Sequence, residues 1–139
     1  MTAGTALSAA PALSALRGAC ASILGVQLSD GSIPWFEGGP WDAWNHAESV
    51  MALAVMGEAD AARAGLDFLQ ETQEADGSWL GGYGNALPMD GPMRIARVAA
   101  PVLKDTNFVA YPAVAVWHGF RLTGDLAEVS RRWPMVRAA

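Results

Sequence analysis

The sequence predicts an all-α fold of consecutive helical hairpins, and three observations support this prediction. Residues that favour helix, such as Ala, Leu, Met, Gln and Glu, are frequent, and β-branched residues rarely occur in alternating runs. Apolar residues instead recur at helical spacing in five segments. A turn of the form Gln-x-x-Asp-Gly-Ser occurs twice, at Gln27–Ser32 and Gln73–Ser78, with an offset of 73 − 27 = 46 residues.

Two helices are expected before residue 60. The first passes through Leu13 and Leu24 and stops at the turn of residues 29–32. A loop rich in Gly and Pro follows over 33–40, and the second helix begins near Asp42, which can cap its free N–H groups. Gly57 ends that helix. Its expected apolar face consists of Trp44, Ala47, Met51, Ala54 and Val55.

Three more helices are expected in the second half. The third carries Ala62, Leu66, Leu69 and Gln73 on one face, and residues 80–104 form a long connection in which 93–103 is a candidate short helix. The fourth runs from Asp105 to Leu122 and is apolar nearly all round, so we expect it to be buried on several sides. The fifth helix spans the apolar residues Leu126, Val129, Trp133 and Val136, and Pro134 is a candidate kink within it. We interpret Arg131, Arg132 and Arg137 as complements of its dipole.

Composition bounds the function classes. The chain is 52% hydrophobic and 17% charged, which predicts one folded domain over residues 1–139. A net charge of −5 without a basic stripe argues against a nucleic-acid partner. Cys20 is the only cysteine and is expected in the core. The absence of a possible disulfide within the chain, the poor match to a signal peptide and the lack of an expected membrane span together favour a cytoplasmic protein. Contact with a membrane surface is left open.

Hairpins of a repeat bury their apolar faces only against neighbours. About two and a half hairpins leave such faces exposed at both ends. The open alternatives are therefore a homo-oligomer, a different polypeptide partner, and C-terminal hairpins missing from this sequence, with a third turn expected near residue 140.

The segment from Gly65 to Trp79 resembles the QW repeat of squalene and oxidosqualene cyclases. It has the small residue, the aromatic Phe68, the Gln73 and the Gly-x-Trp ending of that pattern. The earlier copy is degenerate, with Trp35 a candidate substitute for its missing indole. The resemblance implies an incomplete (α/α)6 toroid, isoprenoid chemistry of the prenyltransferase or terpene-cyclase kind, and bracing roles for Gln73 and Trp79. The family's Asp-rich motifs and its Zn ligands are absent from this sequence, so no metal or cofactor is expected.

A second resemblance competes with the first. The residues from Trp41 to Glu48, and those from Asp105 to His118, look like segments of six-hairpin glycosidases of the glucoamylase kind. These proteins are also α/α toroids, and the resemblance implies a funnel of aromatic and carboxylate side chains that binds sugars.

In such a fold the loops before the inner helices gather at one mouth. The candidate catalytic residues are Asp42, Glu48 and Asp105, because glycoside hydrolysis needs paired carboxylates. Capping is a competing role for Asp42 and Asp105, solvent exposure for Glu48, and packing for His46 and His118. The candidate substrate-binding residues, chosen as ring stackers and hydrogen-bonding groups, are Trp35, Trp41, Trp44, Asn45, His46, Tyr83, Asn107 and Tyr111.

Three functions follow. The leading expectation is a prenyltransferase-like or terpene-cyclase-like enzyme segment that acts on an isoprenoid or isoprenoid-linked substrate. The first alternative is a six-hairpin glycosidase-like protein that acts on a glycan. The second alternative is a non-catalytic helical repeat that packs on a partner.

Overall fold

The computed structural model describes residues 10–84 and 104–139, and it confirms the all-α class. Apart from one two-residue strand pairing, the regular structure of these residues is helical. The expected helix at 93–103 lies outside the described residues. The elements are α1 (Ala10–Val26), β1 (Pro40–Trp41), α2 (Ala43–Val55), α3 (Ala59–Glu71), β2 (Tyr83–Gly84), α4 (Thr106–Thr123) and α5 (Leu126–Ala138).

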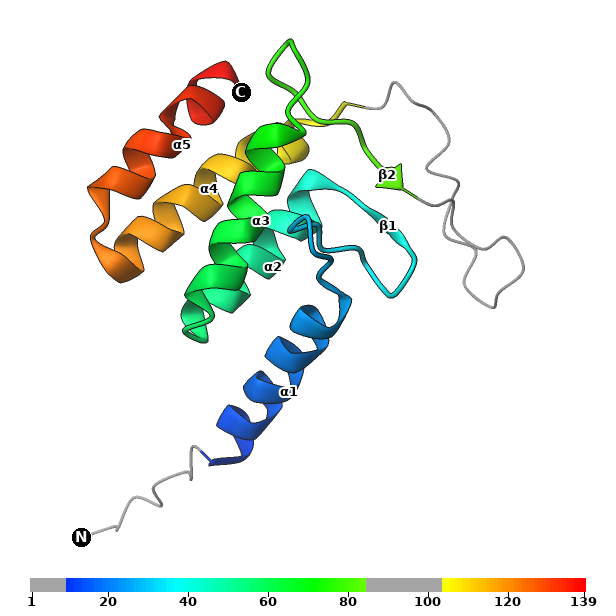
Figure 1. Cartoon of the computed structure of the whole chain (residues 1–139), viewed down its shortest axis with the longest axis vertical. Helices are drawn as coiled ribbons and strands as arrows, with labels where there is room; N and C mark the ends of the chain where they lie inside the picture. The colour runs from blue at the N-terminus through cyan, green and yellow to red at the C-terminus, as the bar shows by residue number, and fades with distance from the viewer. Residues whose placement is uncertain (1–9, 85–103) are drawn as a thin grey trace, which may run out of the picture.

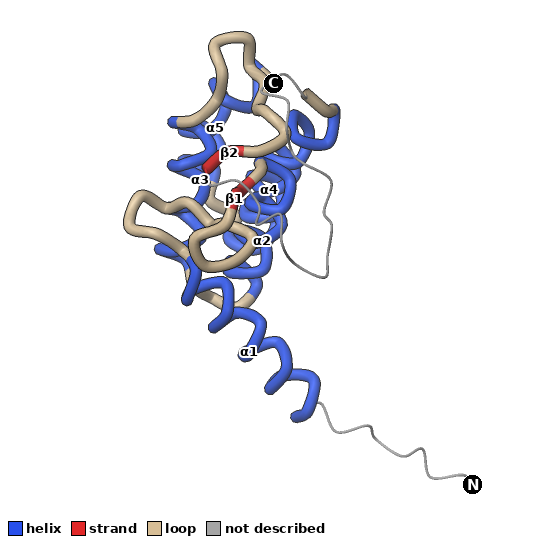
Figure 2. Tube along the Cα trace, turned by 90° about the vertical axis from the view of Figure 1, so that its right-hand side faces the viewer, coloured by secondary structure: helices blue, strands red, loops and turns tan. Residues whose placement is uncertain are grey.

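The helices form two adjoining hairpins. Helix α2 packs against both α3 and α4, and α4 packs against α5 (Figure 1). Helix α1 touches α2 only near its C-terminal end and projects away from the other helices in both views (Figure 2). Strand β1 pairs with β2 in antiparallel register, with Trp41 opposite Tyr83. This pairing joins the loop before α2 to the connection between α3 and α4.

The helix boundaries follow the capping residues. Asp42 accepts a hydrogen bond from the backbone N–H of Asn45, and Asp105 accepts one from that of Asn107. Gly124 adopts a left-handed conformation (φ 70°) and ends α4. These local signals explain why the helix starts predicted from the sequence are confirmed. Pro134 lies inside α5, which remains helical from Leu126 to Ala138.

Two expected burial patterns are confirmed only in part: on the expected face of α2, Ala47 is buried and Met51 and Ala54 pack against the core. In α2 the buried side is formed by Ala43, His46, Ala47, Val50 and Leu53, whereas Val55 is 57% exposed. Because His46 is buried, the side of α2 that faces the core differs from the side that its apolar residues alone predicted. In α4 only Pro112, Ala115 and Val116 are buried, and Trp117 is 56% exposed, because α2 and α5 cover only part of its surface.

The two Gln-x-x-Asp-Gly-Ser turns have the same internal structure, which confirms the repeat. In the first, Asp30 Oδ1 accepts hydrogen bonds from the backbone N–H (2.9 Å) and the hydroxyl (2.6 Å) of Ser32. In the second, Asp76 Oδ1 accepts from the same two groups of Ser78, at 3.2 and 2.6 Å. The bonds from the Ser32 hydroxyl and N–H lower the pKa of Asp30.

Each turn also docks on the helix after the next one. Gln27 Nε2 donates to the carbonyl of Gly31 (3.3 Å) within its turn and to that of Ala61 (3.0 Å) in α3. Gln73 Nε2 donates to Gly77 O (2.8 Å) and to Met135 O (3.0 Å) in α5. The first turn therefore fixes α3, and the second fixes α5.

The indole of the QW-like motif is a brace, as the resemblance implied. Trp79 is fully buried and its Nε1 donates to Leu69 O at 3.1 Å. In the first copy the buried Ile33 occupies the position that corresponds to Trp79. Trp35 does not replace the missing indole, because its Nε1 donates to Asp42 instead.

The arginines of α5 differ in environment, which corrects their common interpretation. Arg132 is 1% exposed, and its Nη2 lies 2.7 Å from both Asp67 Oδ1 of α3 and Glu128 Oε1 of α5. It therefore ties α5 to α3 and is not a surface complement of the helix dipole. Arg131 and Arg137 are exposed.

The outer flank of α4 and α5 repeats the flank that α2 and α3 offer to α4. Residues of α2 and α4 are equivalent when they lie equally far from the caps Asp42 and Asp105. Residues of α3 and α5 are equivalent when they lie equally far from Ala61 and Met135, which accept hydrogen bonds from the turn glutamines. These equivalent pairs are Val50 and Ala113, Ala54 and Trp117, and Ala62 and Val136. That a neighbour covers the outer flank stays a prediction.

The two Gln-x-x-Asp-Gly-Ser turns require glycine for two reasons. The glycine has a positive φ angle, and its Cα lies too close to the backbone of a neighbouring helix for a Cβ to fit. Gly31 (φ 90°) and Gly57 (φ 86°) share one conformation, but a Cβ on Gly31 would lie 2.3 Å from Ala64 O, whereas one on Gly57 would meet nothing within 4 Å. We expect Gly57→Ala to cost about 1 kcal/mol from left-handed strain alone. Gly31→Ala should cost at least about 2 kcal/mol more, since the turn must leave α3.

Urea unfolding of both variants measures this difference directly. Equal losses of unfolding free energy in Gly31→Ala and Gly57→Ala would show that the first turn is not held against α3.

Candidate functional site

A cleft of 730 Å³ opens between the C-terminal end of α1, the loop of residues 33–37 and the outward side of α2. It contains three of the predicted site residues, Trp35, Asn45 and Glu48. The full lining is Ser22, Ile23, Val26, Ile33, Pro34, Trp35, Phe36, Glu37, Asn45, Glu48, Ser49 and Ala52.

Asp42 lies behind the cleft lining and is bonded to two of the lining residues. The residue is 1% exposed. Oδ2 accepts hydrogen bonds from Trp35 Nε1 (2.6 Å) and Asn45 Nδ2 (2.7 Å), and Oδ1 accepts from the Asn45 backbone N–H (2.9 Å). The capping role expected for Asp42 is therefore present, together with a second role in fixing the 33–37 loop to α2.

Glu48 is the carboxylate of α2 that is exposed at the cleft surface. Its Oε1 accepts a hydrogen bond from Trp44 Nε1 at 2.9 Å, one helical turn earlier. The Trp44 ring in turn lies 5.3 Å from the Tyr111 ring of α4. Glu48 thus combines access to the cleft with a held orientation.

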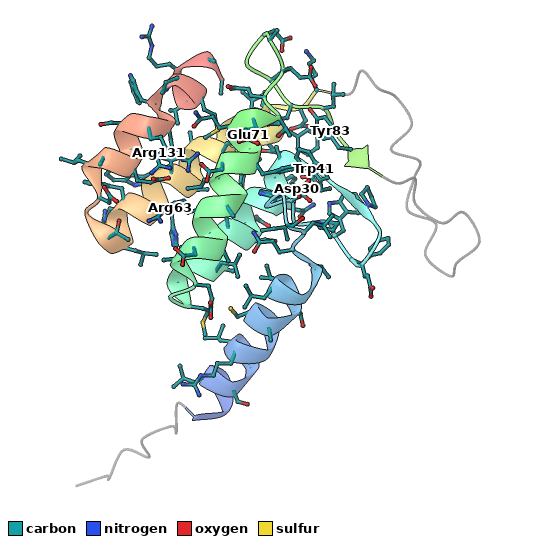
Figure 3. All side chains as sticks on the ribbon, in the orientation of Figure 1. Asp30, Trp41, Arg63, Glu71, Tyr83 and Arg131 are labelled. Atoms are coloured by element: carbon teal, nitrogen blue, oxygen red, sulfur yellow. The ribbon has the colours of Figure 1, made fainter. Side chains whose placement is uncertain are left out.

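Trp41 is buried and Tyr83 is half-buried, and their two rings stack on each other. Their rings are 4.3 Å apart and nearly parallel, at the side of the molecule where β1 and β2 pair (Figure 3). Trp41 also packs edge-on against Phe68 of α3. The Tyr83 hydroxyl accepts from Leu80 N (2.8 Å) and donates to Glu74 Oε1 (3.2 Å), and burial raises the pKa of Tyr83 to about 12. Both residues join the two hairpins and are turned away from the cleft lining.

His46 is also an interior residue. It is fully buried, its Nδ1 accepts from the Ile33 backbone N–H at 3.2 Å, and its Nε2 lies 2.9 Å from Gly65 O. This pairing assigns the proton to Nε2 and leaves the ring neutral. Burial lowers the pKa of His46 to about 4, against the opposing effects of the Gly65 carbonyl, Asp42 and Asp30. The packing interpretation fits this environment.

The expected gathering at one mouth is only partly observed. Asp105 and Asn107 are exposed at the start of α4, where Asp105 caps the helix, and neither lines the cleft. Sequence reasoning missed Glu37, Phe36 and Ser49, which do line it. The i, i+4 spacing of Asn45 and Ser49 could have placed Ser49 on the cleft side of α2, but nothing local marks the two loop residues.

In the described ranges, 10–84 and 104–139, no group of three or more His, Cys, Asp or Glu side chains could hold a metal ion. None of the helices in these ranges has both the length and the apolar character that crossing a bilayer requires.

No protein-family model matches the chain. A curated protein of Mycolicibacterium hassiacum, named MMP endo-(1,4)-3-O-methyl-alpha-D-mannosidase, is 40% identical over 119 residues. The match covers 85% of this chain, but the chain spans about 30% of the length of that relative. The relative is a glycosidase, so the similarity favours the carbohydrate alternative. It gives the isoprenoid expectation no support.

The buried His46 makes stability depend on pH. Its pKa is about 4 in the folded state and 6.5 ordinarily, so the unfolded chain binds more protons between these values. Its contribution to stability is complete above pH 6.5 and is lost as the pH falls toward 4. By pH 5 the loss should reach about 2 kcal/mol.

Urea unfolding between pH 7.5 and 5 measures this loss. His46→Gln should flatten the dependence while lowering stability at pH 7.5, and His118→Gln should retain the dependence. A wild-type unfolding free energy that stays constant from pH 7.5 to 5 would rule out a buried neutral His46.

Proposed function

We propose that this chain is a carbohydrate-active, glycoside-hydrolase-like segment whose cleft between α1, the 33–37 loop and α2 binds a mannose-containing glycan. The observation that carries the proposal is the 40% identity to an endo-(1,4)-3-O-methyl-α-D-mannosidase over 85% of this chain. An α-(1→4)-linked, 3-O-methylated mannose oligosaccharide is accordingly the substrate class proposed.

The composition of the cleft supports a sugar ligand. Its volume of 730 Å³ lies in the range of small-molecule sites. The aromatic rings of Trp35 and Phe36 are suited to the C–H faces of pyranose rings, and Asn45, Glu48 and Ser49 are suited to hydroxyl groups. A long isoprenoid chain would offer these three polar side chains no hydrogen bond beyond those that they make within the protein.

The carboxylates of the cleft are the second support. Glu37 from the loop and Glu48 from α2 both line the cleft, and Asp42 lies behind Trp35 and Asn45. Hydrolysis of a glycosidic bond needs one carboxyl group to protonate the leaving oxygen and a second to act as base or nucleophile. We assign Glu48 to direct contact with the glycan.

We do not propose the complete activity of the relative for this chain, since the chain spans about 30% of that protein's length. What we propose for these residues is glycan binding next to carboxylates of the right chemistry. Isothermal titration of the chain with the methylated oligosaccharide tests binding, and release of reducing ends tests hydrolysis.

Replacing the Glu48 carboxylate by an amide should weaken glycan binding about tenfold. Glu48→Gln keeps an acceptor for Trp44 Nε1 but removes the charge-assisted hydrogen bond to a sugar hydroxyl. Asp105→Asn is the matched control, because it makes the same chemical change at an exposed helix cap outside the cleft.

Three results would contradict the proposal. These are no glycan binding by the wild-type chain, an equal loss in both variants, and a rise in melting temperature with a farnesyl compound but not with the glycan. The last result would restore the isoprenoid expectation.

A further inference from the structure

The side-chain donors of the cleft lining are already bonded within the protein. Trp35 Nε1 donates to Asp42 Oδ2 at 2.6 Å, and one N–H of Asn45 Nδ2 donates to the same oxygen at 2.7 Å. The hydroxyl of Ser49 donates to the Asn45 carbonyl (2.9 Å), and that of Ser22 donates to a carbonyl of its own helix (3.1 Å). Among the described lining residues, the second N–H of Asn45 is the one side-chain donor left for a ligand.

The α2 side of the cleft instead presents acceptors. Glu48 uses Oε1 to accept from Trp44 Nε1, which leaves Oε2 available to a ligand. The bond to Asp42 fixes the orientation of the Asn45 amide, and the Oδ1 of this amide remains available as an acceptor. Ser49 Oγ, whose hydrogen is directed to a helix carbonyl, offers its lone pairs.

The charged side chains of the described lining are of one sign. Glu37 from the loop and Glu48 from α2 are exposed carboxylates, and none of the described lining residues is Lys, Arg or His. Neither carboxylate forms an ion pair with a described residue. A ligand therefore meets uncompensated negative charge as well as acceptor atoms.

The repeat gives an independent reason to regard this side of α2 as a polar surface. The positions of α4 that are equivalent to Asn45, Glu48 and Ser49 are Phe108, Tyr111 and Pro112. These three side chains of α4 are used in packing: Pro112 is buried, Phe108 packs against the core, and the Tyr111 ring lies 5.3 Å from the Trp44 ring of α2. Where one repeat packs rings against a neighbouring helix, the other carries hydrogen-bonding groups at a cleft.

These features determine which chemical groups of a ligand can be satisfied. A sugar hydroxyl can donate its hydrogen to an acceptor of α2, and an ammonium group can donate up to three. A phosphate, sulfate or carboxylate has acceptor oxygens only, so it would face acceptors and charges of its own sign. Its lost hydrogen bonds to water would not be replaced.

We propose that the α2 side of the cleft recognises hydrogen-bond donors, so that the cleft binds sugars whose hydroxyl or ammonium groups donate to Asn45, Glu48 and Ser49 and excludes anionic sugars. This inference rests on the proposed function, and it adds to that function the hydrogen-bonding role and the charge that the glycan must have.

Calorimetric titration of the full chain with single-group analogues of one sugar tests the inference. The parent is the 3-O-methylated, α-(1→4)-linked mannose disaccharide, and each free hydroxyl is replaced in turn by fluorine, which cannot donate, or by a protonated amino group. At a position that faces α2, fluorine should weaken binding about tenfold, whereas the amino group should strengthen it by a similar factor. A phosphate at that position should abolish measurable binding.

Two substitutions of Glu48 separate recognition of donors from the shape of the side chain. Glu48→Gln keeps an acceptor for Trp44 and places an amide donor beside the ligand, so the preference for the amino over the fluoro analogue should fall about tenfold. Glu48→Asp retains the carboxylate and should keep the preference even where the shorter side chain lowers the affinity. Asp105→Asn, which removes a charge outside the cleft, is the control and should leave the preference unchanged.

The outcomes distinguish this inference from the proposed function. If the parent sugar binds but fluorine is tolerated at every position, or if the phosphate analogues bind as tightly as the parent, the inference is overturned and the proposed function stands. An equal loss of preference in Glu48→Gln and Glu48→Asp would also overturn it. Binding of no member of the panel by the wild-type chain would remove both.

Discussion

The placement of the hairpins in this fold depends on the turns that follow α1 and α3. In each turn, one glutamine side-chain amide is bonded both to the turn itself and to a later helix. Gln27 and Gln73 each place Nε2 between a carbonyl of their own turn and a carbonyl of a helix 34 or 62 residues further along the chain. The turn is thereby fixed on that helix, and the glycine of the turn lies directly against the backbone of the helix. Successive hairpins are placed relative to one another by this contact, which burial of apolar faces alone would not orient.

The same constraint positions the cleft. The first turn ends at Ser32, and the next backbone N–H, that of Ile33, donates to the buried His46 of α2. From this anchor the chain runs along the cleft as residues 34–37 and returns to α2 through Asp42, whose carboxylate binds the Trp35 indole. The loop has little regular structure, yet it is bonded at both ends to groups that the turn and α2 hold in place.

Local features of the sequence predicted local features of the structure. The turns, the caps Asp42 and Asp105, and the end of α4 at Gly124 all depend on residues within a few positions of one another. Burial of His46 and Arg132 could not be predicted in this way, because their partners Gly65 and Asp67 belong to another helix. The exposure of Trp117 likewise depends on which helices reach α4.

The candidate site shows the same division. Trp35, Asn45 and Glu48 were predicted from residue type and from their place near a helix start, and they do line one cleft. Trp41, His46 and Tyr83 were chosen on the same grounds of residue type, but they pack against other elements of the fold and do not line the cleft, a difference set by tertiary packing. The QW-like motif favoured an isoprenoid function only by resemblance, since its Gln and Trp donate hydrogen bonds to backbone carbonyls within the fold.

The placement of hairpins by the turn glutamines can be tested by nuclear magnetic resonance of the side-chain amides. We expect the Nε2 protons of Gln27 and Gln73 to exchange slowly with solvent and to show Overhauser contacts to residues 61 and 135, respectively. Exchange at the rate of free glutamine, without those contacts, would contradict the account. The hairpins would then be positioned by some other interaction.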